Sequence, residues 1–240
     1  MTGAFFRGFG ILLAYLLLTA GGALLVRRLH PRMDRELFRK TLHVIVLFAL
    51  PVFLLAFPDW RLSAAAALAL AALIYPVLAI GERFRGYGEL LIQRKNGEVR
   101  RSMVLLFSTY TVIIALCWGW LGDRMLAMAC VYAWGFGDAA AALVGKRFGR
   151  SALHGPLIEG RKSLEGTAAM FAVSFVSVFA IMLARGGLSV GQCLLVAALA
   201  AGASAGAELY TPGGYDTATC PAAAASVILP LVILWQGFPS

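Results

Sequence analysis

An aspartate inside an apolar segment is the residue of this sequence whose placement most suggests chemistry. Asp138 lies in the segment 125–145, within Trp-Gly-Phe-Gly-Asp, about two helical turns before Lys146. A carboxylate in such a segment is unfavourable unless it is paired, which makes Asp138 a functional candidate, with pairing to a neighbouring helix as the structural alternative. Gly135 and Gly137 leave room beside it for a ligand or for a neighbouring backbone.

Three further carboxylates stand at the ends of apolar segments. Glu165 follows Arg161, Lys162 and Ser163, while Glu208 and Asp216 flank a segment that contains no lysine or arginine. Glu165 would also suit the first turn of a helix by favourable interaction with its dipole, and Asp216 is expected in a loop. Because Mg²⁺ binds one or two carboxylates together with phosphate oxygens, we predict a metal site. Its predicted ligands are Asp138, Glu165, Glu208 and Asp216.

Cationic residues accompany these carboxylates. Glu36, Arg39 or Lys40, and His43 are spaced by three and four residues, so they share one face of a helix. Lysine, arginine and a helix N-terminus capped by Ser163 are typical of phosphate binding, although basic residues near apolar segments also serve as membrane anchors. The predicted nucleotide-binding residues are Arg39, Lys40, Lys146, Arg161, Lys162, Ser163 and Gly137.

Carboxylates and cations together indicate metal-assisted phosphoryl transfer. Magnesium and cationic side chains neutralise phosphate charge, and a carboxylate can take the proton of an attacking alcohol. The predicted catalytic residues are Asp138, Glu165, Asp216 and His43. Two soluble nucleotide-binding motifs are excluded. Gly135–Ala140 matches GxGxxA but no strand precedes it, and Gly145-Lys146 lacks the remainder of a P-loop.

The elements that must position these residues are apolar helices. Of the 240 residues, 60% are hydrophobic and only 14% are charged, which excludes a disordered chain and argues against a soluble globule. We predict an all-α polytopic membrane protein, a single transmembrane domain over 1–240 with about eight helices and seven as the lower count. The predicted segments are 5–26, 41–57, 62–80, 102–121, 125–145, 166–184, 188–207 and 222–238.

The basic residues alternate between successive loops. The chain carries 21 lysines and arginines against 12 acidic residues, and most of the basic ones fall in 27–40, 83–101 and 146–162. The remaining four basic residues would lie on the opposite side of the membrane, and they are Arg7, Arg61, Arg124 and Arg185. The positive-inside rule then predicts both termini outside and the candidate site on the cytoplasmic face, with the bacterial inner membrane as the expected location.

Four motifs in order resemble those of the phytol kinase and dolichol kinase family, which includes a CTP-dependent diacylglycerol kinase. They cover 36–225 and read Glu36…Arg39-Lys40…His43, Gly137-Asp138…Gly145-Lys146…Gly149, Lys162-Ser163-Leu164-Glu165-Gly166 and Glu208…Pro212…Asp216…Pro221. The resemblance implies CTP as phosphate donor, a divalent cation such as Mg²⁺, and an isoprenoid alcohol or diacylglycerol as acceptor. The family usually has Asp-Asn in the last motif, whereas this chain has Asp216-Thr217, which offers a hydroxyl in place of the amide.

The expected partners are therefore a lipid alcohol, a nucleoside triphosphate and the lipid bilayer, without nucleic acid. A homo-oligomer is compatible with the sequence. The leading hypothesis is a CTP-dependent lipid-alcohol kinase acting on phytol, farnesol, geranylgeraniol, a polyprenol or diacylglycerol. The alternatives are a lipid-phosphate cytidylyltransferase, which would release pyrophosphate, and a small transporter, which would need intramembrane charges reaching both faces.

Overall fold

The computed structural model describes residues 2–30, 32–84, 87–92, 97–155, 158 and 162–238. Within these residues eight helical segments are long and apolar enough to cross a membrane, and the prediction of an all-α fold with eight spans is confirmed. The contacts group the chain into two compact units, Met1–Ala115 and Leu116–Ser240, here called the N-terminal and C-terminal units.

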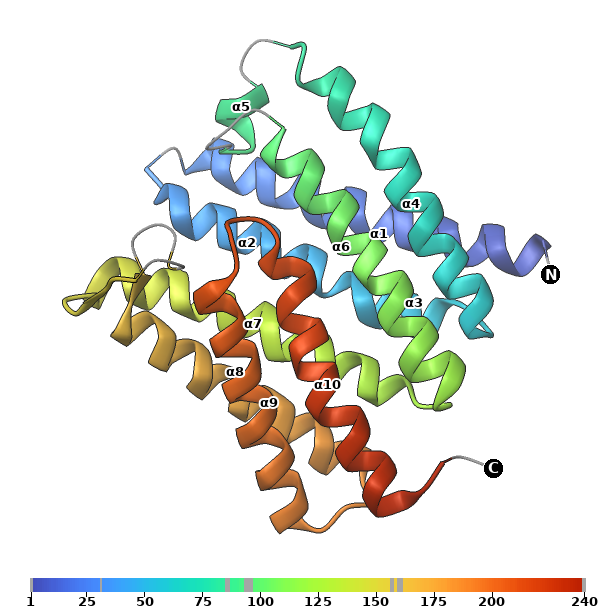
Figure 1. The fold of residues 1–240 in the computed structure, drawn as a ribbon. Helices are drawn as coiled ribbons and strands as arrows, with labels where there is room; N and C mark the ends of the chain where they lie inside the picture. Colours follow the sequence, from blue (N-terminus) through green and yellow to red (C-terminus); the bar gives the residue numbers. More distant parts are fainter. Residues whose placement is uncertain are drawn as a thin grey trace. The chain divides into compact units, whose positions relative to one another are not determined.

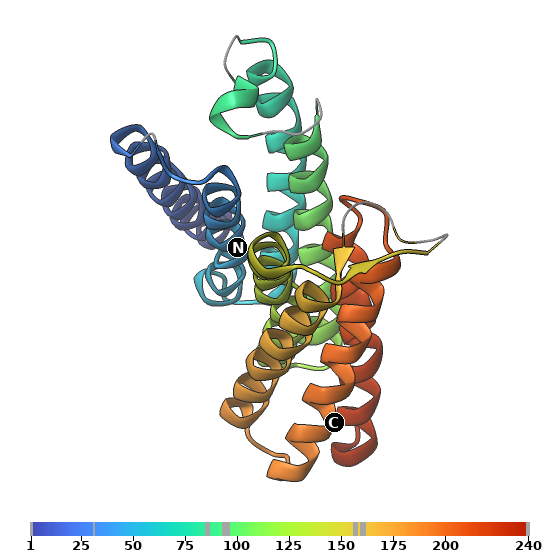
Figure 2. The same cartoon turned by 90° about the vertical axis from the view of Figure 1, so that its left-hand side faces the viewer.

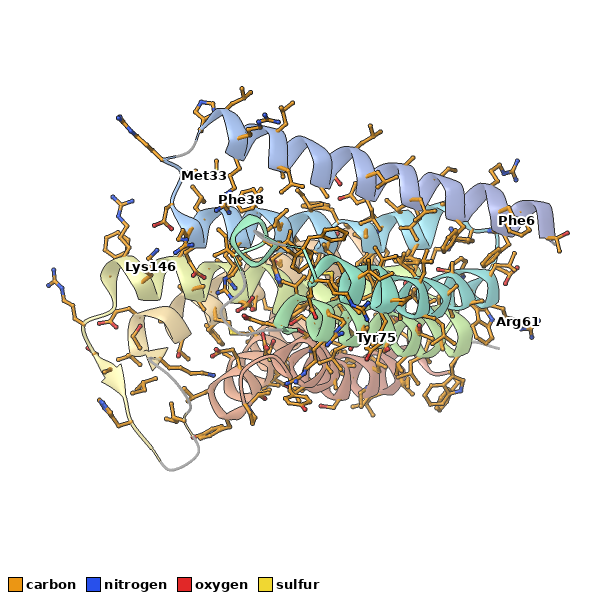
Figure 3. All side chains as sticks on the ribbon, turned by 90° about the horizontal axis from the view of Figure 1, so that it is seen from above. Phe6, Met33, Phe38, Arg61, Tyr75 and Lys146 are labelled. Carbon is orange, nitrogen blue, oxygen red and sulfur yellow. The ribbon has the colours of Figure 1, made fainter. Side chains whose placement is uncertain are left out.

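Among the described residues, four membrane-length segments start in the N-terminal unit, and the last of them runs past its end to Trp120 (Figure 1). Its helices are α1 (Thr2–Leu29), α2 (Arg35–Leu47), α3 (Ala49–Ala56), α4 (Trp60–Gly81), the short α5 (Tyr87–Leu90) and α6 (Glu98–Ile114). Helix α1 packs on α2 and α3, and α4 packs along α6. Phe6 and Arg61 mark one end of this unit, and Met33 and Phe38 mark the other (Figure 3).

A proline explains why the second membrane-length segment is divided into α2 and α3. Pro51 has no N–H to donate to the carbonyl of Leu47, so the helix is interrupted at Phe48. The hydroxyl of the buried Tyr110 on α6 lies 3.2 Å from the carbonyl oxygen of Val46 and 3.4 Å from that of Leu47. The interruption is therefore stabilised by a donor from another helix.

The C-terminal unit is a bundle of four long helices. Its elements are the π-helix η1 (Ala115–Trp120, whose first residue ends the N-terminal unit), α7 (Arg124–Phe148), β1 (Ala152–Leu153), β2 (Lys162–Ser163), α8 (Leu164–Arg185), α9 (Val190–Tyr210) and α10 (Asp216–Gln236). Helix α7 packs against α8 and α10, and α9 lies between α8 and α10 (Figure 2). The end of α7, the start of α8, the end of α9 and the start of α10 thus share one end of the bundle.

Glycines bring α7 and α8 into close contact. A Cβ atom on Gly166 would lie 3.0 Å from the carbonyl oxygen of Ala141, and one on Gly149 would lie 2.8 Å from Oγ of Ser163. A Cβ on Gly137 would clash with Oγ of Ser174. These small residues let the two backbones approach closely, as is common between membrane helices.

Buried polar side chains hold the bundle at two levels. Ser174 of α8 and Ser204 of α9 are fully buried, and both donate to the carbonyl of Ala133 on α7. At the end of the bundle away from β1 and β2, the guanidinium of Arg185 donates to Asp123 and to Gln236, which links the ends of α7, α8 and α10. Ser174, Ser204 and Arg185 therefore each have an acceptor outside their own helix.

Two helices start six residues before the predicted segments, and one of these starts corrects the environment of a site residue. Asp216 was expected in a loop but is the first residue of α10, which runs through Pro221 and starts six residues before the predicted segment. Helix α2 likewise starts at Arg35, because the carboxylate of Asp34 accepts from the backbone N–H groups of Glu36 and Leu37. The β1–β2 pair was not predicted from the sequence.

Candidate active site

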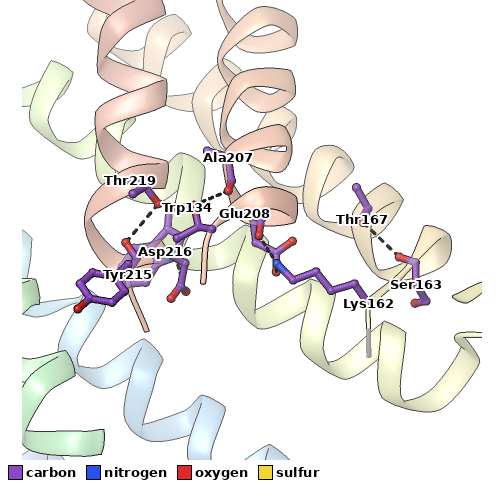
Figure 4. A network of polar contacts seen from close by, with 10 residues as sticks. Trp134, Lys162, Ser163, Thr167, Ala207, Glu208, Tyr215, Asp216 and Thr219 are labelled. Carbon is purple, nitrogen blue, oxygen red and sulfur yellow. Dashed lines mark hydrogen bonds and ion pairs between the residues drawn. The ribbon is translucent and has the colours of Figure 1, made fainter. Parts of the chain in front are cut away.

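A lysine bridges two helices at the shared end of the C-terminal unit. Lys162 is held in β2 by pairing with Leu153, directly before α8. Its Nζ lies 3.1 Å from Oε1 of Glu208 and donates a hydrogen bond to the backbone carbonyl of the same residue (Figure 4). Both side chains are 18% exposed, so the ion pair is largely shielded from solvent. The cation also compensates the partial negative charge at the end of α9.

Two aspartates surround this ion pair. The carboxylates of Asp138 and Asp216 both act electrostatically on Glu208, and Lys162 opposes them. Asp138 is half-buried on α7, Glu208 is in the last turn of α9, and Asp216 opens α10. The structure thus brings together one predicted phosphate-binding cation and three of the four predicted metal ligands.

A tryptophan orients one of these aspartates. The indole Nε1 of Trp134 donates to Oδ2 of Asp216 over 3.2 Å, linking α7 to the start of α10 (Figure 4). Trp134 is only 2% exposed and precedes Asp138 by one helical turn. We did not predict Trp134 from the sequence, although its position four residues before Asp138 places it on the same face of α7.

The start of α8 is an ordered cap. Ser163 is confirmed as the N-cap, since its hydroxyl accepts from the backbone N–H of Gly166. Both carboxylate oxygens of Glu165 accept from the backbone N–H of Ser151, at 3.0 and 3.3 Å. The structure therefore gives Glu165 a role in holding the 150–153 segment.

The carboxylates do not form a compact metal-binding group by themselves. In the described part of the chain, no three histidine, cysteine, aspartate or glutamate side chains are arranged to hold a metal ion. Magnesium needs only one or two protein carboxylates when phosphate oxygens complete its shell. The donor set of Asp138, Glu208 and Asp216 suits such a shared cation, because these oxygen ligands repel one another in its absence.

The remaining predicted residues lie elsewhere. On α2, Arg39 forms an ion pair with Glu36 and lies 3.8 Å from Oε1 of Glu98 on α6, a partner that the sequence did not reveal. Lys40 is buried and His43 is half-buried, both in the N-terminal unit. Lys146 is exposed in the last turn of α7, and Gly137 is covered by α8. The prediction for Arg161 falls outside the described residues.

Comparison with known proteins identifies the family. The chain is 31% identical over 210 residues to a phytol kinase from Synechocystis sp., an alignment that covers 84% of this chain and 82% of the relative. The chain belongs to the phytol kinase family. No family model matches the chain, and no solved structure matches it. The phytol kinase alignment extends over most of both units, so the family resemblance read from the four motifs is confirmed.

Proposed function

We propose that this chain is a membrane-embedded kinase that transfers a phosphate from a nucleoside triphosphate to a long-chain alcohol. Membership of the phytol kinase family supports an alcohol acceptor. The observation that carries the proposal is the convergence of Lys162 with Asp138, Glu208 and Asp216 from the helices of one bundle. A cation beside three carboxylates suits a triphosphate that arrives with its own metal ion.

In this proposal the nucleoside triphosphate binds by replacing the carboxylate of Glu208 on Lys162. Lys162 releases the carboxylate of Glu208 and binds phosphate oxygens, with Lys146 and Arg161 of the same unit contributing charge. The family resemblance favours CTP as the donor.

Asp138, Asp216 and Glu208 are the residues that would hold Mg²⁺. When bound, the ion supplies charge neutralisation for the β- and γ-phosphates. Its positive charge also relieves the mutual repulsion of the three carboxylates, which Lys162 opposes in the structure. Glu165 is a weaker candidate because its oxygens already accept from Ser151.

Asp138 is the candidate base. The acceptor hydroxyl oxygen forms a bond to the γ-phosphorus while the bond from that phosphorus to the nucleoside diphosphate breaks. The hydroxyl proton passes to the carboxylate of Asp138, which is placed by α7 within the apolar bundle. An alcohol with an apolar chain could reach this depth from the bilayer, with its hydroxyl directed to the polar end of the helices.

The surface of the helices supports a membrane location. Large apolar side chains are exposed along several helices, including Leu18 at 76%, Leu55 at 76% and Leu234 at 74%. Such faces are stable against lipid but not against water. We further propose, from the alternation of basic residues, that the active site faces the cytoplasm and both termini face outward in a bacterial inner membrane.

A product assay tests the proposal. Purified protein in lipid nanodiscs receives Mg²⁺ and either CTP or ATP, together with phytol, farnesol, geranylgeraniol, a polyprenol or diacylglycerol. The expected products are a lipid monophosphate and the nucleoside diphosphate, identified by mass. Pyrophosphate with a CMP-bearing lipid, from a lipid phosphate offered in parallel, would instead establish a cytidylyltransferase. No product with any acceptor would refute the kinase.

A further inference from the structure

The Trp134–Asp216 hydrogen bond connects a buried side chain to the edge of the proposed site. The indole has a single N–H, and in the structure Nε1 donates it to Oδ2 of Asp216. The two residues are 82 positions apart in the sequence and belong to α7 and α10. Since Trp134 is 2% exposed, this donor lies where solvent competes little for the carboxylate.

The backbone that carries Trp134 is unusually well anchored. The carbonyl of the preceding residue, Ala133, accepts from Ser174 of α8 and from Ser204 of α9. The ring of Tyr132 makes an edge contact with that of Phe136, with centroids 4.8 Å apart. A donor mounted on a backbone that is hydrogen-bonded to two neighbouring helices can hold the group that it binds in one orientation.

We propose that Trp134 is a positioning residue for divalent metal binding, acting through Asp216. The proposal rests on the proposed function, which makes Asp216 a metal ligand. Asp216 is the first residue of its helix, where a short side chain has several accessible rotamers. The indole N–H holds the carboxylate in one rotamer, in the electrostatic environment that Asp216 shares with Asp138 and Glu208. Donors behind ligating carboxylates raise metal affinity in this way.

The experiment measures metal binding without turnover. Full-length protein in nanodiscs without an acceptor alcohol is titrated with Mn²⁺, both alone and at a fixed concentration of a non-hydrolysable CTP analogue, and the free ion is quantified by electron paramagnetic resonance. W134F keeps an aromatic ring and removes the donor. Replacement of Trp134 by benzothienylalanine keeps the two-ring shape and puts sulfur in place of the N–H group. This variant tests the same hydrogen bond if W134F fails to fold. The matched control is W118F, which makes the same substitution in the same unit. Trp118 contacts Arg124, with the guanidinium carbon 3.9 Å from the ring centroid.

We expect W134F and the benzothienylalanine variant to bind Mn²⁺ roughly tenfold more weakly than the unmodified protein. W118F should bind it normally. Unchanged affinity in both Trp134 variants would overturn the proposal while leaving the kinase assignment intact, and so would an equal loss in W118F. If the unmodified protein shows no saturable Mn²⁺ binding with or without the nucleotide analogue, the metal site of the proposed function fails and this inference fails with it.

Discussion

Nζ of Lys162 lies 3.1 Å from Oε1 of Glu208 and also donates to the backbone carbonyl of that residue. The side chain of Lys162 thus binds both the carboxylate of Glu208 and the backbone in the last turn of α9. The same contact joins the β1–β2 pair, which holds Lys162, to the helix that presents Glu208. The ion pair is consequently both a structural link and the proposed place of phosphate binding, and variants can separate these roles.

Replacement of Lys162 by methionine should weaken both stability and nucleotide binding. Glu208 would remain beside Asp138 and Asp216 without its cation, which we expect to cost roughly 1.5–3 kcal/mol of unfolding free energy. The double variant K162M/E208Q should recover stability without recovering activity, because the repulsion is removed but the phosphate ligand is still missing. Thermal midpoints and the KM for nucleotide would be measured for both. Recovery of activity in the double variant would contradict the phosphate role of Lys162.

D138N should abolish phosphate transfer while leaving the fold intact. The amide cannot take a proton from the acceptor and is a poorer metal ligand, so we expect a loss of at least about 100-fold in kcat. The matched control is D123N, which makes the same change at the Arg185 contact on the far end of α7. D123N should lower the thermal midpoint but keep kcat. Near-normal turnover by D138N would show that another group is the base.

G137A should destabilise the α7–α8 contact. The added methyl group would clash with Ser174 and lie 3.0 Å from Cγ of Met170, and such overpacking typically costs about 1–3 kcal/mol. G206A is the control, since nothing lies within 4 Å of a Cβ at that position of α9. Removing a helix-interior glycine there should stabilise the protein by up to about 1 kcal/mol. Thermal unfolding would compare the two, and equal midpoints would contradict the packing role.

Tyr87 should give stability an alkaline limit. Burial, followed by repulsion from Glu82, raises the pKa of the Tyr87 phenol, while Arg100 acts in the opposite direction. An unfolded tyrosine ionises near pH 10, before the folded one does. The unfolded state therefore loses its proton first, and stability falls as the pH rises above about 10 toward the folded pKa.

The Y87F variant isolates this contribution. In the described part of the chain no hydrogen-bond partner lies within reach of the buried Tyr87 hydroxyl, so its removal should leave stability at pH 7 equal or higher. The fall in stability above pH 10 should become shallower than in the unmodified protein. An unchanged alkaline profile, measured by thermal unfolding across pH 8–11, would exclude Tyr87 as its source.

The helices and most site residues could be predicted from the sequence because apolar length and isolated charges are local signals. Asp138 stood out inside an apolar segment, and Glu208 and Asp216 stood out beside a loop without cations. The residues that these side chains contact on other helices could not be predicted, because such contacts depend on how each helix is rotated against its neighbours. Trp134 reaches Asp216, and Glu98 reaches Arg39, only in the packed helices. Glu165 turned toward Ser151 because of a strand pair of two residues on each side, too short to leave a pattern.

The glycine and serine contacts between α7 and α8 also determine how the site can change. A Cβ on Gly166 would lie 3.0 Å from the backbone carbonyl oxygen of Ala141, and a backbone atom cannot move away by changing its rotamer. The separation between the helix that carries Asp138 and the strand end that carries Lys162 is therefore set by main-chain contact and not by side-chain size. Redesign of acceptor preference must leave this spacing alone and alter the outward faces of the helices, which tolerate changes of shape.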